Sequence, residues 1–325
     1  MSFDIISVGD PTIDTFLDVH DASVTCNIDR SACKLCFDYA EKIPVNKLRR
    51  LVAGNCANNA IGSSRLGLKA AYYMIVGADD NGKWIADTLK KEKVADDYFV
   101  FDKKNPTNAS TVINFKGERT ILVYHAPRTY KLPKLKKSKW LYYSSVNKGH
   151  RTLNGSVLKH VAKHGIKLCY NPGTYQRLEG AKQMQRVASK TYATFVNVQE
   201  AQDLTESKSF KIPTLLKKMK ALGMHTAIIT DGAAGSYAYD GTAMWHVGTP
   251  PTPVIERTGA GDAFATTLIV QLHHGKPLPD AMAIATCNSS SVIMKIGPQE
   301  GLLKPKQLER FFKKYKKQLS IKKIG

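Results

Sequence analysis

The sequence predicts an α/β protein built on a mainly parallel central sheet, with helices on its faces and a small β lid. Short apolar segments of strand length alternate with longer amphipathic segments along most of the chain. A pair of additional strand-like segments interrupts this alternation in the first half. The chain has 325 residues, 43% of them hydrophobic, and no visible repeat or low-complexity linker, so we expect residues 1–325 to form one domain.

The predicted strands of the central sheet are rich in β-branched and aromatic residues and end near Gly, Asn, Asp or Pro. The segments between them place apolar residues at helical spacing. Strands separated by helices form right-handed crossover units, which produce a parallel sheet. The predicted strands are residues 4–8, 70–76, 140–144, 167–170, 194–198 and 226–230, and the predicted helices are residues 58–66, 84–92, 154–163, 180–189, 214–222 and 305–319.

Two regions depart from this alternation. Residues 13–52 show no clean pattern of helix and strand, whereas residues 109–114 and 120–124 are strand-like and flank the turn Lys116-Gly117-Glu118. We expect residues 11–52 and 105–126, approximately, to form a lid over the carboxyl edge of the sheet, where open α/β sheets bind ligands. The lid is also a candidate contact surface for a homodimer.

The chain is strongly basic, with 48 Lys and Arg against 27 Asp and Glu, a formal net charge of +21. Such a field attracts phosphorylated ligands. The positive residues are spread along the chain, and no nucleic-acid-binding motif is visible, so we do not expect a nucleic-acid partner. No segment approaches the roughly 18 apolar residues of a membrane span. The N-terminal residues lack the pattern of a signal peptide, and we expect a cytoplasmic protein.

Three of the six cysteines, Cys26, Cys33 and Cys36, lie close together in the region expected to form the lid. A disulfide scaffold is not expected in a long chain without a signal peptide. Cys33 and Cys36 have the spacing of a zinc knuckle, but a full set of four ligands is not evident. Two interpretations therefore stay open for these residues: a zinc site, or ordinary reduced thiols.

Residues 256–264, Glu-Arg-Thr-Gly-Ala-Gly-Asp-Ala-Phe, form the sharpest motif. They precede an apolar stretch and predict a strand-to-helix turn whose backbone N–H groups and helix dipole make an anion site. Gly259 and Gly261 let an anion approach the backbone, and the dipole favours an ionised Asp262. A carboxylate beside a phosphate site is what a kinase needs to deprotonate an attacking hydroxyl. A tight packing turn with a capping aspartate is the alternative interpretation.

This motif resembles the C-terminal signature of the PfkB, or ribokinase-like, family of carbohydrate and nucleoside kinases. The resemblance implies a ribokinase-like fold, with Asp262 as the catalytic base. It also implies that Gly259, Ala260 and Gly261 form the anion hole for the transferred phosphoryl group.

Further segments resemble motifs of the same family in the family's order. The stretch Gly9 to Asp14 resembles its opening strand, which implies that Asp14 hydrogen-bonds the hydroxyls of the acceptor. The segment 54–60 resembles its N-terminal signature, and Gly77-x-Asp79-x-x-Gly82 resembles its turn. The residues that these and the remaining motifs imply are Gly54, Asn55 and Asn58 for the sugar, Asn197 and Glu200 for Mg²⁺ through water, and Thr230, Gly232, Gly235 and Asn288 for the nucleotide.

The sequence departs from the family at Glu256 and Arg257, where Asp followed by Thr or Ser is usual. Glu256 keeps the acid, but Arg257 is a change of chemistry in a stretch that helps some members bind potassium. Dependence on a monovalent cation is therefore in doubt. Arg257 either clamps a phosphate with its guanidinium group or faces solvent.

The function expected from the sequence is an ATP-dependent phosphotransferase, with Mg²⁺, that phosphorylates a hydroxyl of a sugar in the manner of ribokinase or fructokinase. A nucleoside kinase of the adenosine type is the alternative, since Asp14, Asn55 and Asn58 also suit a ribonucleoside. Such an enzyme needs an apolar wall for the base, for which Phe16, Tyr124 and Tyr130 are available. A non-catalytic sugar-binding protein is a remote third hypothesis, disfavoured by the intact motif around Asp262.

Overall fold

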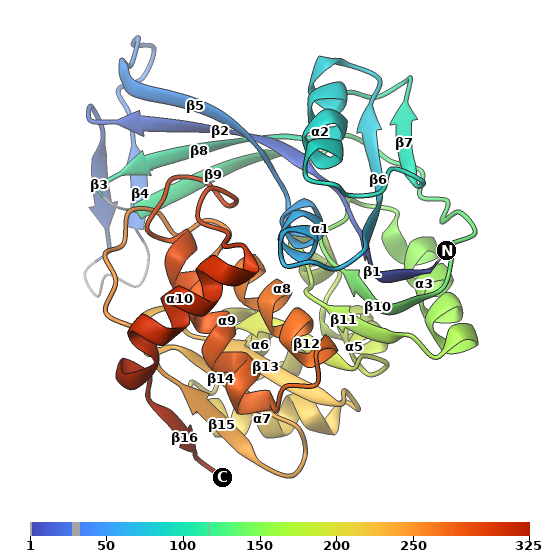
Figure 1. The fold of residues 1–325 in the computed structure, drawn as a ribbon. Coiled ribbons are helices and arrows are strands. Elements are labelled where there is room, and N and C mark those ends of the chain that lie inside the picture. The colour runs from blue at the N-terminus through green and yellow to red at the C-terminus, as the bar shows by residue number, and fades with distance from the viewer. Residues whose placement is uncertain (1, 28–32, 117) are drawn as a thin grey trace.

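The computed structural model describes residues 2–27, 33–116 and 118–325. Its central sheet has ten strands (Figure 1). Seven neighbouring strands of this sheet are parallel to one another: β7, β6, β1, β10, β11, β12 and β13. This confirms the predicted fold class and all six predicted strands. The strands lie in the order β7 (Phe99–Asp102), β6 (Ala70–Gly77), β1 (Phe3–Val8), β10 (Ser138–Tyr143), β11 (Lys167–Tyr170), β12 (Ala193–Asn197), β13 (Thr226–Thr230), β14 (Ser236–Tyr239), β15 (Met244–Val247) and β16 (Ile321–Lys323).

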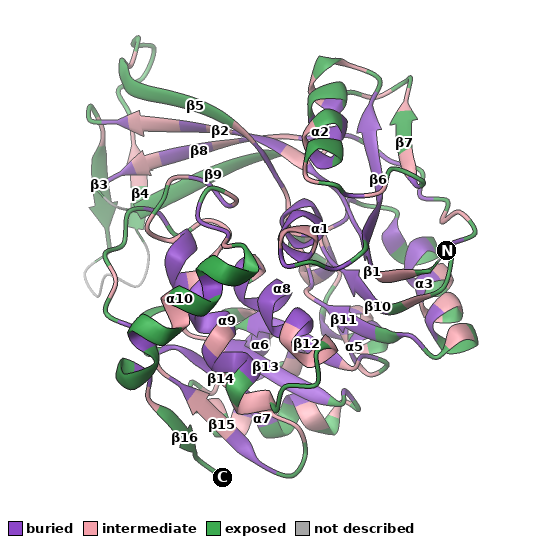
Figure 2. Cartoon of the chain, in the orientation of Figure 1, coloured by how far each residue is buried: buried purple, intermediate pink, exposed green. Residues whose placement is uncertain are grey.

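Helices cover both faces of the central sheet, and alternate residues of each strand contribute to two separate cores. Burial on both faces explains why the parallel strands have nearly continuous apolar sequences. Figure 2 shows these central strands as largely buried. One face packs against α1 (Asn55–Arg65), α2 (Asp80–Lys91), α8 (Ala260–His273), α9 (Leu278–Val292) and α10 (Pro305–Tyr315), and the other against α3 (His150–His164), α5 (Ala181–Ala188), α6 (Val198–Thr205) and α7 (Ile212–Ala221), with the short α4 (Thr174–Leu178) beside α5 and α6.

The edge of the sheet formed by β14, β15 and β16 is antiparallel and was not predicted. The predicted helix 305–319 is observed as α10 followed by a short 3-10 turn, Lys316–Gln318. The chain then pairs β16 with β15, and further hydrogen bonds join Met244 to the last two residues.

A separate four-stranded sheet, which we call the lid sheet, has the order β5 (Val45–Ala53), β2 (Thr12–Val19), β8 (Ala109–Phe115) and β9 (Glu118–Tyr124). In Figure 1 it lies at one side of the molecule, with the hairpin β3 (Ser23–Cys26) and β4 (Cys33–Cys36) at its outer end. The predicted hairpin is confirmed as β8 and β9, although Gly117 of its turn lies outside the described residues. The homodimer contact stays a prediction.

Asp79 connects the lid sheet to the central domain. Its Oδ1 accepts hydrogen bonds from the backbone N–H of Gly82 at 2.8 Å and from Thr107 Oγ1 at 2.6 Å, so it caps α2 and holds the segment that enters β8. A Cβ at Gly82 would lie 2.0 Å from the carbonyl oxygen of Gly77. The Gly77-x-Asp79-x-x-Gly82 turn is therefore required for packing at the base of the lid.

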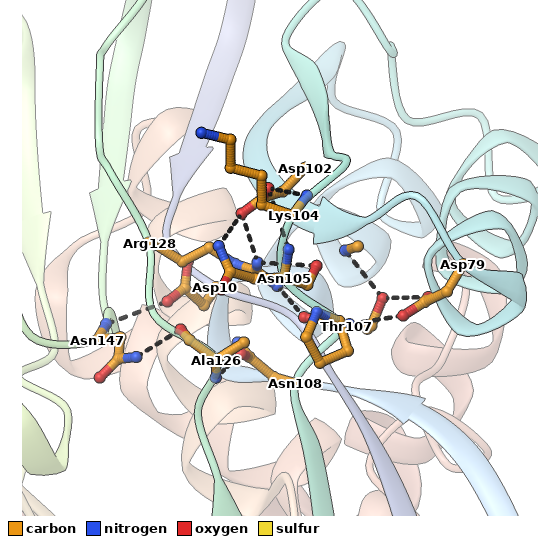
Figure 3. Close-up of polar contacts among 12 residues, drawn as sticks. Asp10, Asp79, Asp102, Lys104, Asn105, Thr107, Asn108, Ala126, Arg128 and Asn147 are labelled. Atoms are coloured by element: carbon orange, nitrogen blue, oxygen red, sulfur yellow. Dashed lines mark hydrogen bonds and ion pairs between the residues drawn. The ribbon is translucent and has the colours of Figure 1, made fainter.

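Polar contacts also fix the segment that leaves the lid (Figure 3). The buried guanidinium group of Arg128 pairs with Asp102 at 3.0 Å and donates to the carbonyl oxygen of Pro106 at 2.5 Å. The amide of Asn147 donates to the carbonyl oxygen of Ala126 at 2.6 Å. The two chain segments at the base of the lid are thus tied to each other and to the central sheet.

The structure corrects the expectation for the cysteines. Cys26 and Cys33 are directly opposite each other in the β3–β4 hairpin, and their sulfurs form a disulfide. Two of the three proposed zinc ligands are therefore bonded to each other, and Cys36 pairs with Ser23 at the other end of the hairpin. Within the described ranges, no group of three or more His, Cys, Asp or Glu is arranged to hold a metal. The buried Cys56, Cys169 and Cys287 are free thiols.

Candidate active site

The ends of β11, β12 and β13 and the start of α8 surround a pocket of about 250 Å³ at the carboxyl edge of the central sheet. Residues from motifs that are far apart in the sequence meet in this pocket. The motif residues that line it are Asn55, Asn197, Glu200, Thr230, Gly259, Gly261 and Asp262. The structure therefore brings together in this pocket half of the residues that the sequence selected.

The turn before α8 has the form of an anion site. Gly259 caps the helix with φ at 81°, and a Cβ there would lie 2.4 Å from the Cβ of Pro298, so packing alone requires this glycine. Gly261 differs, because a Cβ there would meet no described atom within 4 Å. Its missing side chain leaves the pocket open in front of the helix N-terminus, where an anion is stabilised.

Asp262 lies in the first turn of α8 and is held by Asn58, whose Nδ2 donates to Oδ2 at 2.8 Å. The amide of Asn58 is oriented in turn by Gln299, whose Nε2 donates to Asn58 Oδ1 at 3.0 Å. Burial raises the pKa of Asp262 to about 6 and the Glu200 carboxylate adds to this effect, against hydrogen bonds from Asn58 and Asn55. The carboxylate is therefore mostly ionised at pH 7, but much closer to protonation than an exposed aspartate.

Asp14 lies on β2 and is only 7% exposed. Its Oδ1 is buried and has no hydrogen-bond partner among the described residues. Burial raises its pKa to about 6, the hydroxyls of Ser110 and Thr12 lower it, and the Glu256 and Asp262 carboxylates raise it. A buried carboxylate oxygen without a partner costs free energy, and a ligand hydroxyl can supply the missing hydrogen bond.

The start of α1 packs closely against the turn that follows β1. Gly54 has φ at 105°, and a Cβ there would lie 2.8 Å from the carbonyl oxygen of Asp10, so backbone packing accounts for this glycine. Asn55 Nδ2 donates to Asn171 Oδ1 at 2.9 Å. Asn171 also lines the pocket. It was not among the residues selected from the sequence, although its place directly after β11 is the signal that could have found it.

Asn197 and Glu200 form a reciprocal capping box at the start of α6. Asn197 Oδ1 accepts from the backbone N–H of Glu200, and Glu200 Oε2 accepts from that of Asn197, both at 2.9 Å. The box uses one oxygen of Glu200, whose pKa is raised by burial. Carboxylate and amide oxygens are hard donors that suit Mg²⁺, which keeps several of its waters. The second carboxylate oxygen of Glu200 is left for an ion held mainly through water, and this assignment stays a prediction.

A second pocket, of about 450 Å³, adjoins the first. It is lined by Thr230, Gly232 and Gly235, as predicted, and by Ala260 and Gly261 at the start of α8. Its volume is in the range of small-molecule sites. The pocket is also lined by four residues that were not selected from the sequence: Thr286, Ser289 and Ser290 of α9, and Ile293 directly after it.

The structure corrects the assignment of Asn288. This residue is buried, its Nδ2 donates to Thr267 Oγ1 at 2.8 Å, and its Oδ1 accepts from the backbone N–H of Leu303 at 3.0 Å. It therefore faces α8 and the segment before α10. The pocket is lined by the opposite side of α9, because residues one position away on a helix point in different directions.

Two arginines stand where the pockets meet. Arg257, in the loop before α8, and Arg119, on β9 of the lid sheet, both line the two pockets described above and a third one under the lid. The sequence left the role of Arg257 open, and the structure places it at the pocket wall. Arg119 was not selected, because only the strand pairing of the lid brings it to this position.

The fold is an α/β fold with a mainly parallel central sheet and a small separate β sheet, and its pocket has a carboxylate beside a helix N-terminus, as a kinase needs. The family model for "pfkB family carbohydrate kinase" matches residues 23–305 of the chain. The chain therefore belongs to the pfkB family of carbohydrate kinases.

Several relatives are similar over most of their length. A 5-dehydro-2-deoxygluconokinase of Geobacillus thermodenitrificans is 26% identical over 288 residues, which cover 82% of this chain and 86% of that protein. The structure of Arabidopsis thaliana ribokinase with ribose and ATP superposes with a TM-score of 0.78 at 20% identity, covering 96% of this chain and 99% of the other. A Burkholderia thailandensis nucleoside kinase in complex with inosine superposes with a TM-score of 0.77 at 16% identity, covering 96% and 98%. Both structures are similar in fold.

No helix in the described part of the chain is both long enough and apolar enough to cross a bilayer.

Proposed function

We propose that this protein transfers the γ-phosphoryl group of ATP to a hydroxyl of a sugar, with Asp262 as the general base. The observation that carries the proposal is the position of Asp262: its half-buried carboxylate lies beside the open N-terminus of α8, in a pocket that joins the site around Thr230. Asn58 and Gln299 fix its orientation. The relatives named as sugar kinases support the class of acceptor.

In the proposed reaction, the acceptor hydroxyl attacks the γ-phosphorus as its proton passes to Asp262. The bond between the γ-phosphorus and the oxygen that bridges to the β-phosphorus breaks, and ADP leaves. Backbone N–H groups of the Gly259–Gly261 turn stabilise the transferred charge. The N–H of Ala260 donates to the carbonyl oxygen of Arg257 at 3.3 Å in this structure, so it must turn away from that oxygen to take part. Arg119 and Arg257 lie at the junction of the pockets and add positive charge there. Closure of the lid sheet excludes water that would otherwise hydrolyse ATP.

Mg²⁺, when bound with the nucleotide, neutralises phosphate charge. Because Glu200 fits a water-mediated site, Glu200→Gln is expected to raise the Mg²⁺ concentration needed for half-maximal rate. Glutamine retains the capping box, so α6 should remain intact. Acceptor affinity measured without nucleotide should hardly change. Rates measured over a Mg²⁺ titration test this, and an unaltered Mg²⁺ dependence would remove Glu200 from the metal site.

The raised pKa values of Asp262 and Asp14 predict where activity is lost in acid. Both carboxylates act in the ionised form, so kcat/KM for the acceptor should be full above about pH 7 and fall as the pH drops through about 6. Because two carboxylates ionise, kcat/KM should fall more steeply on the acid side than it would for a single group. Asp14→Asn removes one of the two ionisations and should make this fall less steep. The measurement uses saturating nucleotide and Mg²⁺ from pH 4.5 to 8.5. A plateau that extends to pH 4.5 would contradict the assignment.

The acceptor is tested by nucleotide-dependent turnover over a panel of sugars, sugar acids and nucleosides. We favour a sugar or sugar acid, in line with the 5-dehydro-2-deoxygluconokinase relatives. A nucleoside kinase stays the alternative, as some fold neighbours are nucleoside kinases. Its aromatic wall is weaker than expected, because the hydroxyl of Tyr130 is bound to Asp10 and Tyr124 is half exposed on β9. Absence of turnover across the panel would favour the remote third hypothesis, a non-catalytic sugar-binding protein.

A further inference from the structure

One face of the lid sheet gathers positive side chains. On β2 and β5, Phe16 is paired with Arg49 and Asp18 with Lys47. Side chains alternate along a strand, and those of directly paired residues point to the same face. Arg49 and Lys47 are therefore on the face that carries Asp14. Arg119 joins them, because it pairs with Asn114, which is in register with Asp18.

A pocket of about 270 Å³ lies between this face and the loop before α8. Four cations line it: Lys47, Arg49 and Arg119 from the lid sheet and Arg257 from the loop. Two carboxylates, Asp18 and Glu256, also line it, which leaves a formal surplus of two positive charges.

The positive charges of this pocket are poorly compensated. Within the described residues, none of the four cations forms an ion pair. Glu256 is engaged elsewhere, since its Oε1 accepts from the backbone N–H of Thr258 at 2.6 Å and its Oε2 from that of Gly297 at 3.4 Å. The chain is basic throughout, but a solvated basic face does not require cations to converge on one hollow from two parts of the fold.

The cations divide into two sets by position. Arg119 and Arg257 also line the pockets around Asp262 and Thr230, where phosphate is expected, whereas Lys47 and Arg49 line neither of those pockets. Arg49 is opposite Phe16, two residues beyond Asp14, which is about 7 Å along the strand. A chain of six carbons has a similar length, about 6 Å, when extended. An acceptor held at Asp14 can therefore reach Arg49 with its far end.

We propose that the acceptor is an anionic sugar, and that Lys47 and Arg49 bind its carboxylate or phosphate group. Asp14 then binds a hydroxyl of the acceptor, and Asp262 takes the proton of the hydroxyl that is phosphorylated. This inference rests on the proposed kinase function and specifies its substrate class. A guanidinium group binds either anion in a bidentate manner. A neutral sugar would leave the like charges of this pocket close together and uncompensated when the lid closes.

Matched pairs of probes test the inference: gluconate against glucose, and fructose 6-phosphate against fructose, each with ATP and Mg²⁺. We expect the anionic member of at least one pair to have the higher kcat/KM. The double variant Lys47→Ala/Arg49→Ala should lower kcat/KM for that probe by about 10- to 100-fold, the loss of one or two charge-assisted contacts. It should leave the neutral probe nearly unchanged. Which pair responds distinguishes carboxylate from phosphate.

Lys34→Ala is the matched control, since it removes an exposed lysine from the β3–β4 hairpin, outside the pocket. A preference for neutral probes, or equal losses for both members of a pair, would overturn the inference while leaving the kinase function intact. If no probe is phosphorylated, the affinity for gluconate and for fructose 6-phosphate is measured by calorimetry without nucleotide, in the wild type and in the double variant. Binding that weakens in the double variant supports the anion site, and binding that is absent or unchanged overturns it.

Discussion

Asp262→Asn is expected to lower kcat by about 100-fold or more, the contribution of a positioned general base. Asparagine cannot take the proton of the attacking hydroxyl, but its side-chain oxygen can still accept the hydrogen bond from Asn58. Nucleotide binding should be largely retained, because the Thr230 pocket and the turn before α8 are unchanged. Steady-state and single-turnover rates at saturating ATP measure the effect on chemistry.

The stability of this variant provides a second measurement. The folded-state pKa of Asp262 is raised to about 6 by burial, so folding disfavours its charged form near pH 7. Replacing it with a neutral isostere should leave the free energy of unfolding unchanged or larger. Asp280→Asn, the same substitution in the first turn of α9, is the control and should not change kcat. Turnover near the wild-type rate in Asp262→Asn would remove this residue from the mechanism.

Asp14→Ala is expected to raise the KM of the acceptor by about 10- to 150-fold, which corresponds to losing a charge-assisted hydrogen bond of about 1.5–3 kcal/mol. The buried Oδ1 without a protein partner is the structural reason, since a ligand hydroxyl is what satisfies it. The KM of ATP should hardly change, because Asp14 does not line the proposed nucleotide pocket, to which the lid sheet contributes Arg119.

A deoxy acceptor separates this contact from a general disturbance of the lid. The analogue that lacks the contacted hydroxyl should lose affinity with the wild-type enzyme and little more with Asp14→Ala, because the two changes remove the same interaction. Equal losses in both enzymes would show that Asp14 does not bind that hydroxyl. Asp14→Asn should give an intermediate KM, as it keeps an acceptor oxygen but not the charge.

The central sheet could be predicted because its strands are buried on both faces and leave a strong apolar signal. The hydrophobic pattern located the ends of the first two helices better than their starts. The predicted helices 58–66 and 84–92 end within one residue of α1 and α2, but both helices begin earlier, at Asn55 and Asp80. The first turn of α2 is polar, and that of α1 has only the small apolar residues Cys56 and Ala57 between two asparagines, so hydrophobic periodicity gives little signal for either start.

The lid strands and the disulfide were harder to predict, because both depend on which strands pair with each other. Most of β5 is exposed and rich in Lys and Arg, so it has no core face to produce an alternating pattern, and Figure 2 shows it exposed along most of its length. Cys26 and Cys33 were considered as metal ligands because sequence spacing does not reveal that they oppose each other across a hairpin.

The site was predictable where a residue belongs to a local motif and not where a distant contact sets its role. Asp262 and Gly261 were found from one turn. Gln299 was not, because its role depends on a hydrogen bond to Asn58, which is 241 residues away in the sequence. Asn288 was misplaced for a related reason: a motif gives a position on a helix but not which side faces a ligand.

The strand β16 has a consequence for how the protein behaves at high concentration. Without it, β15 would present unpaired backbone groups along the rim of the central sheet, and such a rim recruits strands from other molecules. β16 covers that rim and presents exposed lysines, Lys322 and Lys323, which repel a further strand. Replacing Lys322 and Lys323 with apolar residues therefore acts directly on the element that protects the sheet from self-association.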